Sequence, residues 1–376
     1  MSRRDVVLTP LSVGSCETVD PVEPPVPDLP QPEELGPPNF RWGNLDGNSF
    51  SRAIDKAYEE TVHWKCNLFD VPRGNAGTLF VQEIARLLDA YSHATALEGI
   101  ALKAVMVLPA LLLQKPHPKA KSKDLSVRLN DRFVRWQDGD IDSLLHEGRT
   151  IQSRLNTCQQ RRHDGAKVAR SFEKLVAAGN VKAALRLVTE QSNTGCLGLD
   201  SLQPDGRTVK DHLLDKHPPG NPAAPSTISG TPSVPEPHPI VFEQIDGSLI
   251  RSTIQRLSGS AGPSGMNAKG WKQMCSSFHR TSNELCEAIA RLTRRICLTY
   301  VDPRGISPLV ASRLIALDKS AGIRPIGVGE ILRRLIGKVV LHIAQEDIQR
   351  TVGSFQLCAG QDAACEAGTH AVRRVY

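Results

Sequence analysis

One stretch, residues 313–341, constrains the fold of this chain more than any other. It begins with the apolar run Leu314–Leu317, which suits a buried strand. Gly322 suits a turn because glycine adopts the positive φ angles that other residues resist. Ile-Arg-Pro-Ile at 323–326 indicates a returning strand, and apolar residues recur at helical spacing from about Glu330. The pattern therefore predicts a β-hairpin followed by a helix with one apolar and one basic face.

Two cations belong to this hairpin. Lys319 ends the first predicted strand, and Arg324 lies in the second. Lysine can act as a point charge, and arginine can hold phosphate oxygens with its planar fork, so the pair suits a polyanion. A surface hairpin with two solvated charges explains the same local pattern, and the residues alone leave both interpretations open.

The stretch resembles the fingers of a reverse transcriptase from non-LTR (LINE-like) retrotransposons, where an apolar strand ending in Lys precedes a turn, Arg-Pro-Ile and a helix. Gly259–Met266 resembles the glycine-rich motif of that family, although Ser264 stands where the family often has Asp. Gln356–Gln361, with Glu366-Ala367 and Ala371-Val372, resembles the "Q-x-G … A" helix of the family. The order and spacing of these motifs cover about the last third of the chain.

The resemblance implies roles for the basic residues of this region. Lys319 and Arg324 would contact the incoming nucleoside triphosphate. Charge and helix face alone place Arg333, Arg334 and Lys338 near the backbone of a template. The expected partner is therefore RNA or DNA.

The resemblance also implies what the chain lacks. In the family, carboxylates on a palm region hold two Mg²⁺ ions for phosphoryl transfer. Asp347 and Asp362 match neither of the carboxylate motifs. We therefore expect no catalytic residues, no cofactor and no polymerase activity in this chain alone, which would be truncated before the palm. The missing palm of a longer polyprotein would be a partner, and Mg²⁺ is expected only in a full-length polymerase. A non-catalytic nucleic-acid-binding or interaction protein is the alternative.

Proline clusters suggest the domain organisation. Residues 1–39 form a Pro-rich tail that we expect to be disordered, and residues 191–240 form a Pro-rich linker. Between them, residues 40–190 show the periodicity of a helical domain, and residues 241–376 contain the reverse-transcriptase-like fingers. The predicted fold class is mainly α, with a helical N-terminal domain and an α+β fragment. Within the second domain, residues 281–284, Thr-Ser-Asn-Glu, predict a helix-capping box.

A second basic stretch lies inside the predicted helical domain. The net charge of the whole chain is only +6, which is compatible with nucleic-acid binding without being diagnostic of it. Three arginines of the stretch are predicted to share a helix face opposite Leu129 and Phe133. A phosphate-tracking surface and an ordinary solvated face are both open interpretations. The candidate residues are Lys115, Lys119, Lys121, Lys123, Arg128, Arg132 and Arg135.

Metal and membrane signals are weak. Residues 138–142 alternate carboxylates as calcium loops do, but the later ligand positions fail, so Asp140 or Asp142 is better explained as a helix N-cap. The nine cysteines are scattered and follow no secretion signal, which favours an intracellular protein without distinguishing nucleus from cytoplasm. Three of them, eleven residues apart from 275 to 297, are expected to be buried apolar groups rather than metal ligands. The longest apolar run, Ala104–Leu113, is too short to cross a bilayer.

Overall fold

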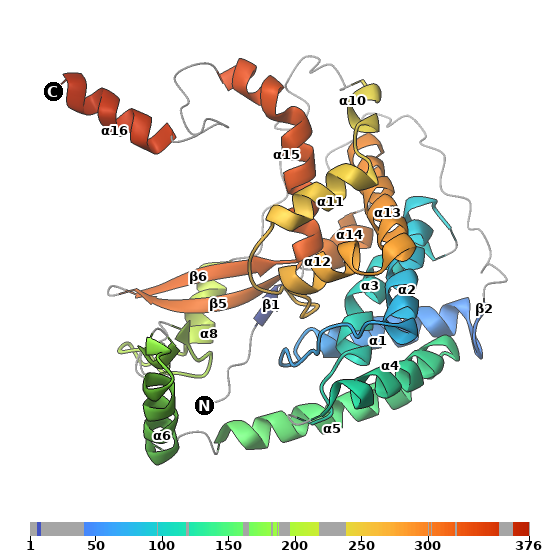
Figure 1. Ribbon diagram of the computed structural model, residues 1–376, viewed down its shortest axis with the longest axis horizontal. Helices are drawn as coiled ribbons and strands as arrows, with labels where there is room; N and C mark the ends of the chain where they lie inside the picture. Colours follow the sequence, from blue (N-terminus) through green and yellow to red (C-terminus); the bar gives the residue numbers. More distant parts are fainter. Residues whose placement is uncertain are drawn as a thin grey trace, which may run out of the picture.

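The computed structural model is mainly helical, with a four-stranded antiparallel sheet around β5 and a separate two-stranded sheet of β2 and β3 (Figure 1), which confirms the predicted fold class. It describes residues 6–8, 41–95, 97–117, 120–160, 165–181, 183–185, 187, 196–217, 238–299, 301, 303–319, 322–352 and 364–375. Most of the Pro-rich tail, the centre of the expected linker and Gln356–Gln361 lie outside these residues.

The helices and strands follow one another along the whole chain. The N-terminal part contains β1 (Val6–Leu8), β2 (Arg41–Trp42), β3 (Leu45–Asp46), α1 (Gly47–Thr61), α2 (Asn75–Ser92), α3 (Glu98–Leu112), α4 (Ser122–Gln137), α5 (Ile141–Gln160) and α6 (Gly165–Ala177). The C-terminal part contains β4 (Cys196–Leu197), α8 (Val209–Asp215), α10 (Ile240–Glu243), α11 (Gly247–Arg256), α12 (Ala268–Ser276), α13 (His279–Leu298), α14 (Pro303–Val310), β5 (Ser312–Lys319), β6 (Gly322–Gly329), α15 (Ile331–Val352) and α16 (Ala364–Val375).

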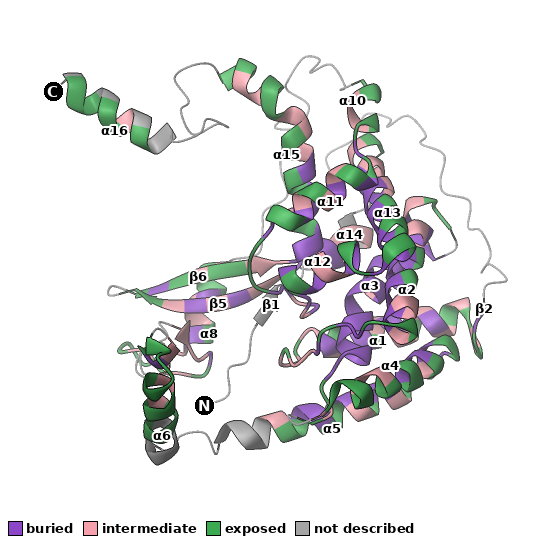
Figure 2. Cartoon of the chain, viewed as in Figure 1, coloured by how far each residue is buried: buried purple, intermediate pink, exposed green. Residues whose placement is uncertain are grey.

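The regions predicted as two domains share one hydrophobic core. Helix α13 packs along α2, and buried side chains of both helices belong to the same apolar cluster (Figures 1 and 2). Arg291 of α13 also donates two hydrogen bonds of 2.8 Å to the carboxylate of Asp89 on α2. Residues 40–190 and 241–376 therefore do not have separate cores, because the apolar stripe of α13 is buried against α2.

An aromatic cluster closes the N-terminal end of this core. The Trp42 ring stacks on Phe50 at 4.5 Å between centroids and meets the edge of Trp136 at 5.6 Å. Trp42 Nε1 donates to the carbonyl oxygen of Trp136, and Trp136 Nε1 donates to Glu83, which pairs with Arg86. The hydrogen bonds satisfy both indole N–H groups, which would be costly to bury without a partner.

The predicted hairpin is confirmed. Strands β5 and β6 are antiparallel over their whole length, from the pair of Ser312 with Gly329 to the pair of Lys319 with Gly322. Gly322 has a φ of +134°, as its predicted position in the turn requires. Pro325 lies on β6, which within the described chain pairs only with β5, so its missing N–H leaves no gap in the ladder.

Part of the expected linker is folded onto this hairpin. Strand β4 pairs with β5 through Cys196 and Leu197, and α8 packs its apolar side on the same sheet. Thr208 caps α8 by accepting a hydrogen bond from the amide of Asp211. Strand β1, from the expected Pro-rich tail, pairs with β5 as well. These short strands add to the open edge of β5, which offers unpaired backbone groups.

Two helix starts test the capping predictions. Asp140 accepts a 3.3 Å hydrogen bond from the amide of Ser143 and so caps α5, as predicted. The capping box predicted at residues 281–284 is wrong, since α13 begins at His279. Ser282 is instead buried, and its hydroxyl donates to the carbonyl oxygen of Met274 at 2.7 Å. The same hydroxyl accepts a 2.9 Å hydrogen bond from the amide of Phe278, so its polar group joins the end of α12 to the start of α13.

Helix α15 begins at Ile331, next to the predicted start at Glu330. Its first turns are buried, through Ile331, Leu335 and Val339. From Leu341 onward no described residue of the helix is buried, and this half extends from the body of the molecule (Figure 2). Within the described part of the chain, no helix is both long and apolar enough to cross a membrane.

Candidate nucleic-acid interface

The hairpin has one covered face and one open face. Residues directly opposite each other in an antiparallel pair point to the same side of the sheet. Leu314, Ala316 and Ile323 point to the covered side, where they contact Leu199, Val209 and Leu213 of the β4–α8 segment. The other side carries Ile315, Leu317 and Ile326, of which Ile326 is exposed.

Lys319 and Arg324 lie together on the open face. Lys319 pairs with Gly322 and Arg324 pairs with Leu317, so the two cations are diagonal neighbours on one side of the hairpin. Diagonal neighbours lie roughly 7–8 Å apart, a separation that adjacent phosphate groups can bridge. Both side chains are exposed, and the tip of the hairpin projects away from the main helical body that contains α1–α3 and α11–α14 (Figure 1). The structure thus places the two predicted nucleotide contacts side by side.

The glycine-rich motif packs against the start of α15. A side chain at Gly262 would place its Cβ 2.8 Å from the backbone nitrogen and Cα of Glu330, so only glycine fits here. Ser264 donates two hydrogen bonds to the Glu330 carboxylate. The backbone N–H of Ser264 donates one at 2.6 Å, and its hydroxyl donates the other at 2.8 Å. These contacts fix the helix that follows the hairpin relative to the glycine-rich motif.

Glu330 is the most perturbed acid of this junction. Burial raises the pKa of its carboxyl to about 7, although the Ser264 hydrogen bonds and the nearby Arg334 and Arg313 charges act in the opposite direction. The hydroxyl of Tyr58 is buried nearby with no hydrogen-bond partner among the described residues. Burial is the main cause that raises the pKa of the Tyr58 hydroxyl, and the negative charge of Glu330 raises it further. Sequence reasoning missed Glu330, and only its place at the end of the hairpin hinted at a special role.

The basic face predicted on α15 is only partly free. Arg334 donates to the carbonyl oxygens of Ser258 and Ser260 and so holds the glycine-rich motif. Arg333 donates to the carbonyl oxygen of Val310 at 3.0 Å but remains exposed, and Lys338 is exposed. Arg334 therefore has a structural role, because both of its terminal nitrogens donate to carbonyl oxygens of the chain.

The basic stretch on α4 also divides into free and structural residues. Arg132 is 1% exposed and lies beside Leu129 and Phe133, so the prediction that it faces away from them is wrong. Its Nη1 donates to the carbonyl oxygens of Leu112 and Gln114 at 2.8 Å each. These acceptors end α3 and begin the following loop, where carbonyl groups lack helical partners. Arg132 cannot contact a ligand in this fold.

Glu147 of α5 organises the arginines of α4. One carboxylate oxygen accepts from Arg132 and the other accepts from Arg135 at 2.7 Å, while Arg128 lies 3.9 Å away. Burial alone raises the pKa of Glu147, but the hydrogen bonds and charges of Arg132 and Arg135 outweigh it and hold the pKa below its usual value. Glu147, which the sequence pattern did not indicate, therefore neutralises part of the predicted basic surface.

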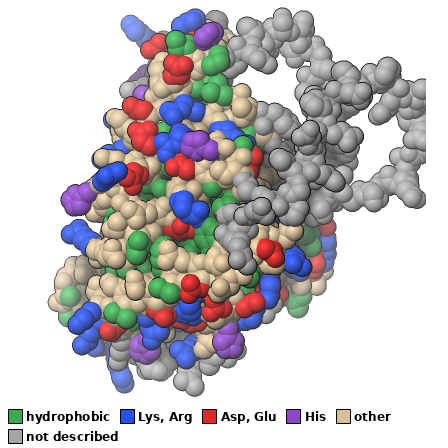
Figure 3. All heavy atoms as spheres, turned by 90° about the vertical axis from the view of Figure 1, so that its right-hand side faces the viewer, with side chains coloured by type: hydrophobic (Ala, Val, Ile, Leu, Met, Phe, Trp, Pro, Cys, Tyr) green, Lys and Arg blue, Asp and Glu red, His purple; other side chains and the backbone are tan. Residues whose placement is uncertain are grey.

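The lysines of residues 115–135 lie at the surface wherever the structure describes them. Lys115, Lys121 and Lys123 are exposed at the surface, and Lys119 lies outside the described residues. On the side of the molecule away from the hairpin tip, positive and negative side chains are interspersed (Figure 3). The described part of that side therefore carries no field of one sign in this view.

The described residues hold no group of His, Cys, Asp and Glu side chains arranged to bind a metal ion. Cys275 and Cys286 are buried, as predicted, and Cys297 is half-buried. No family model matches the chain, and neither a curated protein nor a solved structure shows significant similarity to it.

Proposed function

We propose that the chain binds nucleic acid and a nucleoside triphosphate as the fingers of a retrotransposon-type RNA-directed DNA polymerase. The observation that carries the proposal is the placement of Lys319 and Arg324 on the open face of a hairpin. Apolar contacts cover the opposite face, so the two cations lie on the side that these contacts leave open. Lysine and arginine then supply a point charge and a fork to adjacent phosphate groups.

A template strand would extend from this hairpin toward α15. Lys338 and the outer donors of Arg333 remain available for its phosphates, whereas Arg334 is used within the chain. Such contacts carry little sequence information, and their strength falls with rising salt. The hypothesis of a polymerase fingers region therefore predicts non-specific, salt-sensitive binding of RNA or DNA.

The test removes the two hairpin cations. In the double variant K319A/R324A, we expect nucleoside triphosphate affinity to fall about 10-fold or more, because each charge-assisted hydrogen bond contributes about 1.5–3 kcal/mol. Titration of the purified chain with a fluorescent nucleoside triphosphate measures the affinity. The matched control R52A/R280A removes two exposed positive charges from α1 and α13 and should bind as the wild type does. Equal affinities for the hairpin variant and the wild type would contradict the proposal.

A non-catalytic nucleic-acid-binding protein is the second candidate. The shared core favours it, because α13 buries its apolar face against α2 and needs no palm region to do so. This candidate predicts that RNA or DNA binds to the chain while nucleoside triphosphates do not bind at the hairpin, so K319A/R324A leaves triphosphate affinity unchanged. Anisotropy of labelled RNA, measured beside the triphosphate titration, separates the two functions.

A further inference from the structure

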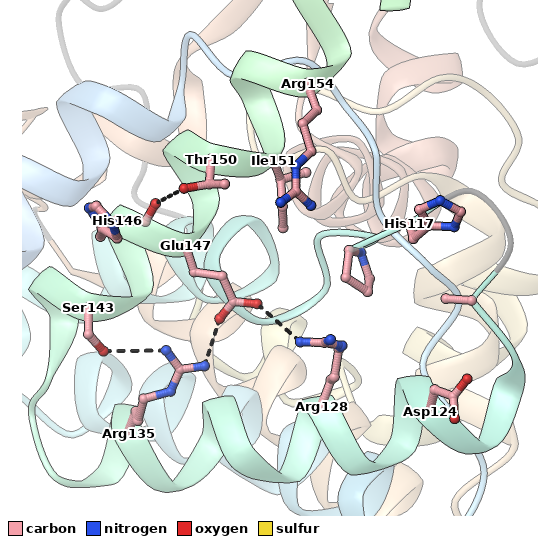
Figure 4. Close-up of a pocket in the computed structure, with 12 residues that line it drawn as sticks. His117, Asp124, Arg128, Arg135, Ser143, His146, Glu147, Thr150, Ile151 and Arg154 are labelled. Atoms are coloured by element: carbon pink, nitrogen blue, oxygen red, sulfur yellow. Dashed lines mark hydrogen bonds and ion pairs between the residues drawn. The ribbon is translucent and has the colours of Figure 1, made fainter.

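A hollow of about 810 Å³ lies between α4, α5 and the chain that leads into α4. Arg128 extends into it from α4, and Arg154 extends into it from α5 on the opposite wall (Figure 4). His117 lies on a third side, and His146 lines the hollow near Glu147. A volume of this size suits a ligand as large as a nucleotide, since small-molecule sites measure roughly 300–1,000 Å³.

The carboxylates around the hollow are already engaged. Glu147 shares its charge between Arg132 and Arg135, and Asp124 accepts a hydrogen bond from the amide of Lys121 at the start of α4. The lining contains three arginines, Arg128, Arg135 and Arg154, and two carboxylates, Asp124 and Glu147. The buried Arg132, which pairs with Glu147, adds a further positive charge beside it. The excess positive charge favours an anion over a neutral or cationic ligand.

Two arginines remain available to such a ligand. The side chain of Arg128 is 53% exposed, and its closest carboxylate oxygen, on Glu147, is 3.9 Å away. Arg154 is exposed and makes no hydrogen bond or ion pair with another residue in the described part of the chain. Their forks approach from facing walls, a geometry that suits the several oxygens of one phosphate group.

We propose that this hollow binds the phosphate group of a nucleotide through Arg128 and Arg154. Arg135, held by Glu147 and Asp131, provides a fixed positive background rather than a direct contact. The nucleotide can be a free molecule or one unit of a nucleic-acid strand, since both present the same phosphate. The site uses none of the hairpin residues, so it does not rest on the polymerase-like function.

The test is calorimetric titration of the full chain with adenosine monophosphate and with a short single-stranded oligonucleotide. In R128M/R154M we expect the affinity for the bound probe to fall about 10-fold or more. K319A/R324A leaves this site intact and should bind adenosine monophosphate as the wild type does. R52M/R280M, which removes the same charge from distant exposed positions, should do so as well.

The two probes identify the source of the phosphate. Tight binding of adenosine monophosphate that the oligonucleotide does not displace indicates a free nucleotide, whereas preferred binding of the oligonucleotide indicates a strand. If neither probe binds to the wild type, or if each probe that binds to the wild type binds to R128M/R154M unchanged, the proposal is overturned. The single variant R154M guards against misfolding, because Arg154 has no described partner to lose, and its weaker binding alone supports the site.

Discussion

Replacement of Arg132 by methionine tests the structural role of the α4 arginines most directly. Arg132 is fully enclosed, and it donates to two backbone carbonyl oxygens and twice to Glu147, at 3.1 and 2.7 Å. Methionine occupies much of the same volume without any donor, so the variant removes hydrogen bonds and leaves only a small cavity. The change therefore isolates the polar contribution of the guanidinium.

The expected loss follows from the partners left behind. The carbonyl oxygens of Leu112 and Gln114 become unpaired in a buried site, and each such group costs about 1–3 kcal/mol. Glu147 loses one arginine but keeps Arg135, and its side chain is one-quarter exposed, which limits its share of the loss. Breaking a buried ion pair on one side costs about 3–5 kcal/mol, and we expect R132M to fall in that range.

Urea unfolding followed by circular dichroism measures this loss. The matched control is R128M, four residues earlier on the same helix, where a half-exposed side chain has only a 3.9 Å contact with Glu147. Its free energy of unfolding should lie within about 0.5 kcal/mol of the wild-type value. If R132M were as stable as R128M, the guanidinium would not be holding the end of α3, and the reasoning would be refuted.

Two further predictions concern the junction of the hairpin with α15. Burial raises the pKa of Glu330 from 4.5 to about 7, so the folded chain holds this proton more tightly, and wild-type stability falls as pH rises between these values. The advantage of E330Q over the wild type should therefore be about 2.5 kcal/mol larger at pH 8 than at pH 5, and parallel pH profiles would contradict this. G262A should cost about 1–3 kcal/mol through its clash with the Glu330 backbone. G99A, with no atom within 4 Å of the new Cβ and a helical site, should be neutral or stabilising.

Local pattern predicted the hairpin and the helix after it well. The apolar run, the turn glycine and the helical repeat act over a few residues, and the structure contains each of them. The same kind of pattern misplaced Arg132. It lies three residues after Leu129 and four before Trp136, which is the spacing of the buried face, so the signal was present in the sequence. The prediction that Arg132 faces solvent rested on its charge, whereas its position on the helix places it on the buried face.

The domain division shows a different limit. Helical periodicity indicates that α13 has an apolar face, but it does not indicate which helix covers that face. The Pro-rich segment suggested a boundary between two cores, whereas α13 and α2 form one core across about 200 residues of chain, with Arg291 and Asp89 202 positions apart. Likewise, β1 of the expected Pro-rich tail and β4 of the expected linker pair with β5 because that strand had an open edge.

The sequence by itself determined the hairpin, its turn, the mainly helical class and the presence of Lys319 and Arg324 on one strand-turn-strand unit. These features depend on backbone preferences and on neighbours a few residues away. Only the tertiary structure decided which cations stay free, because the donors of Arg132 and Arg334 are taken by carbonyl oxygens distant in the chain. It also decided the burial of the Glu330 carboxylate against Ser264. Ser264 and Glu330 are 66 residues apart, and no local pattern encodes such a contact. The physical reason is that burial and charge pairing depend on which surfaces meet when the chain folds.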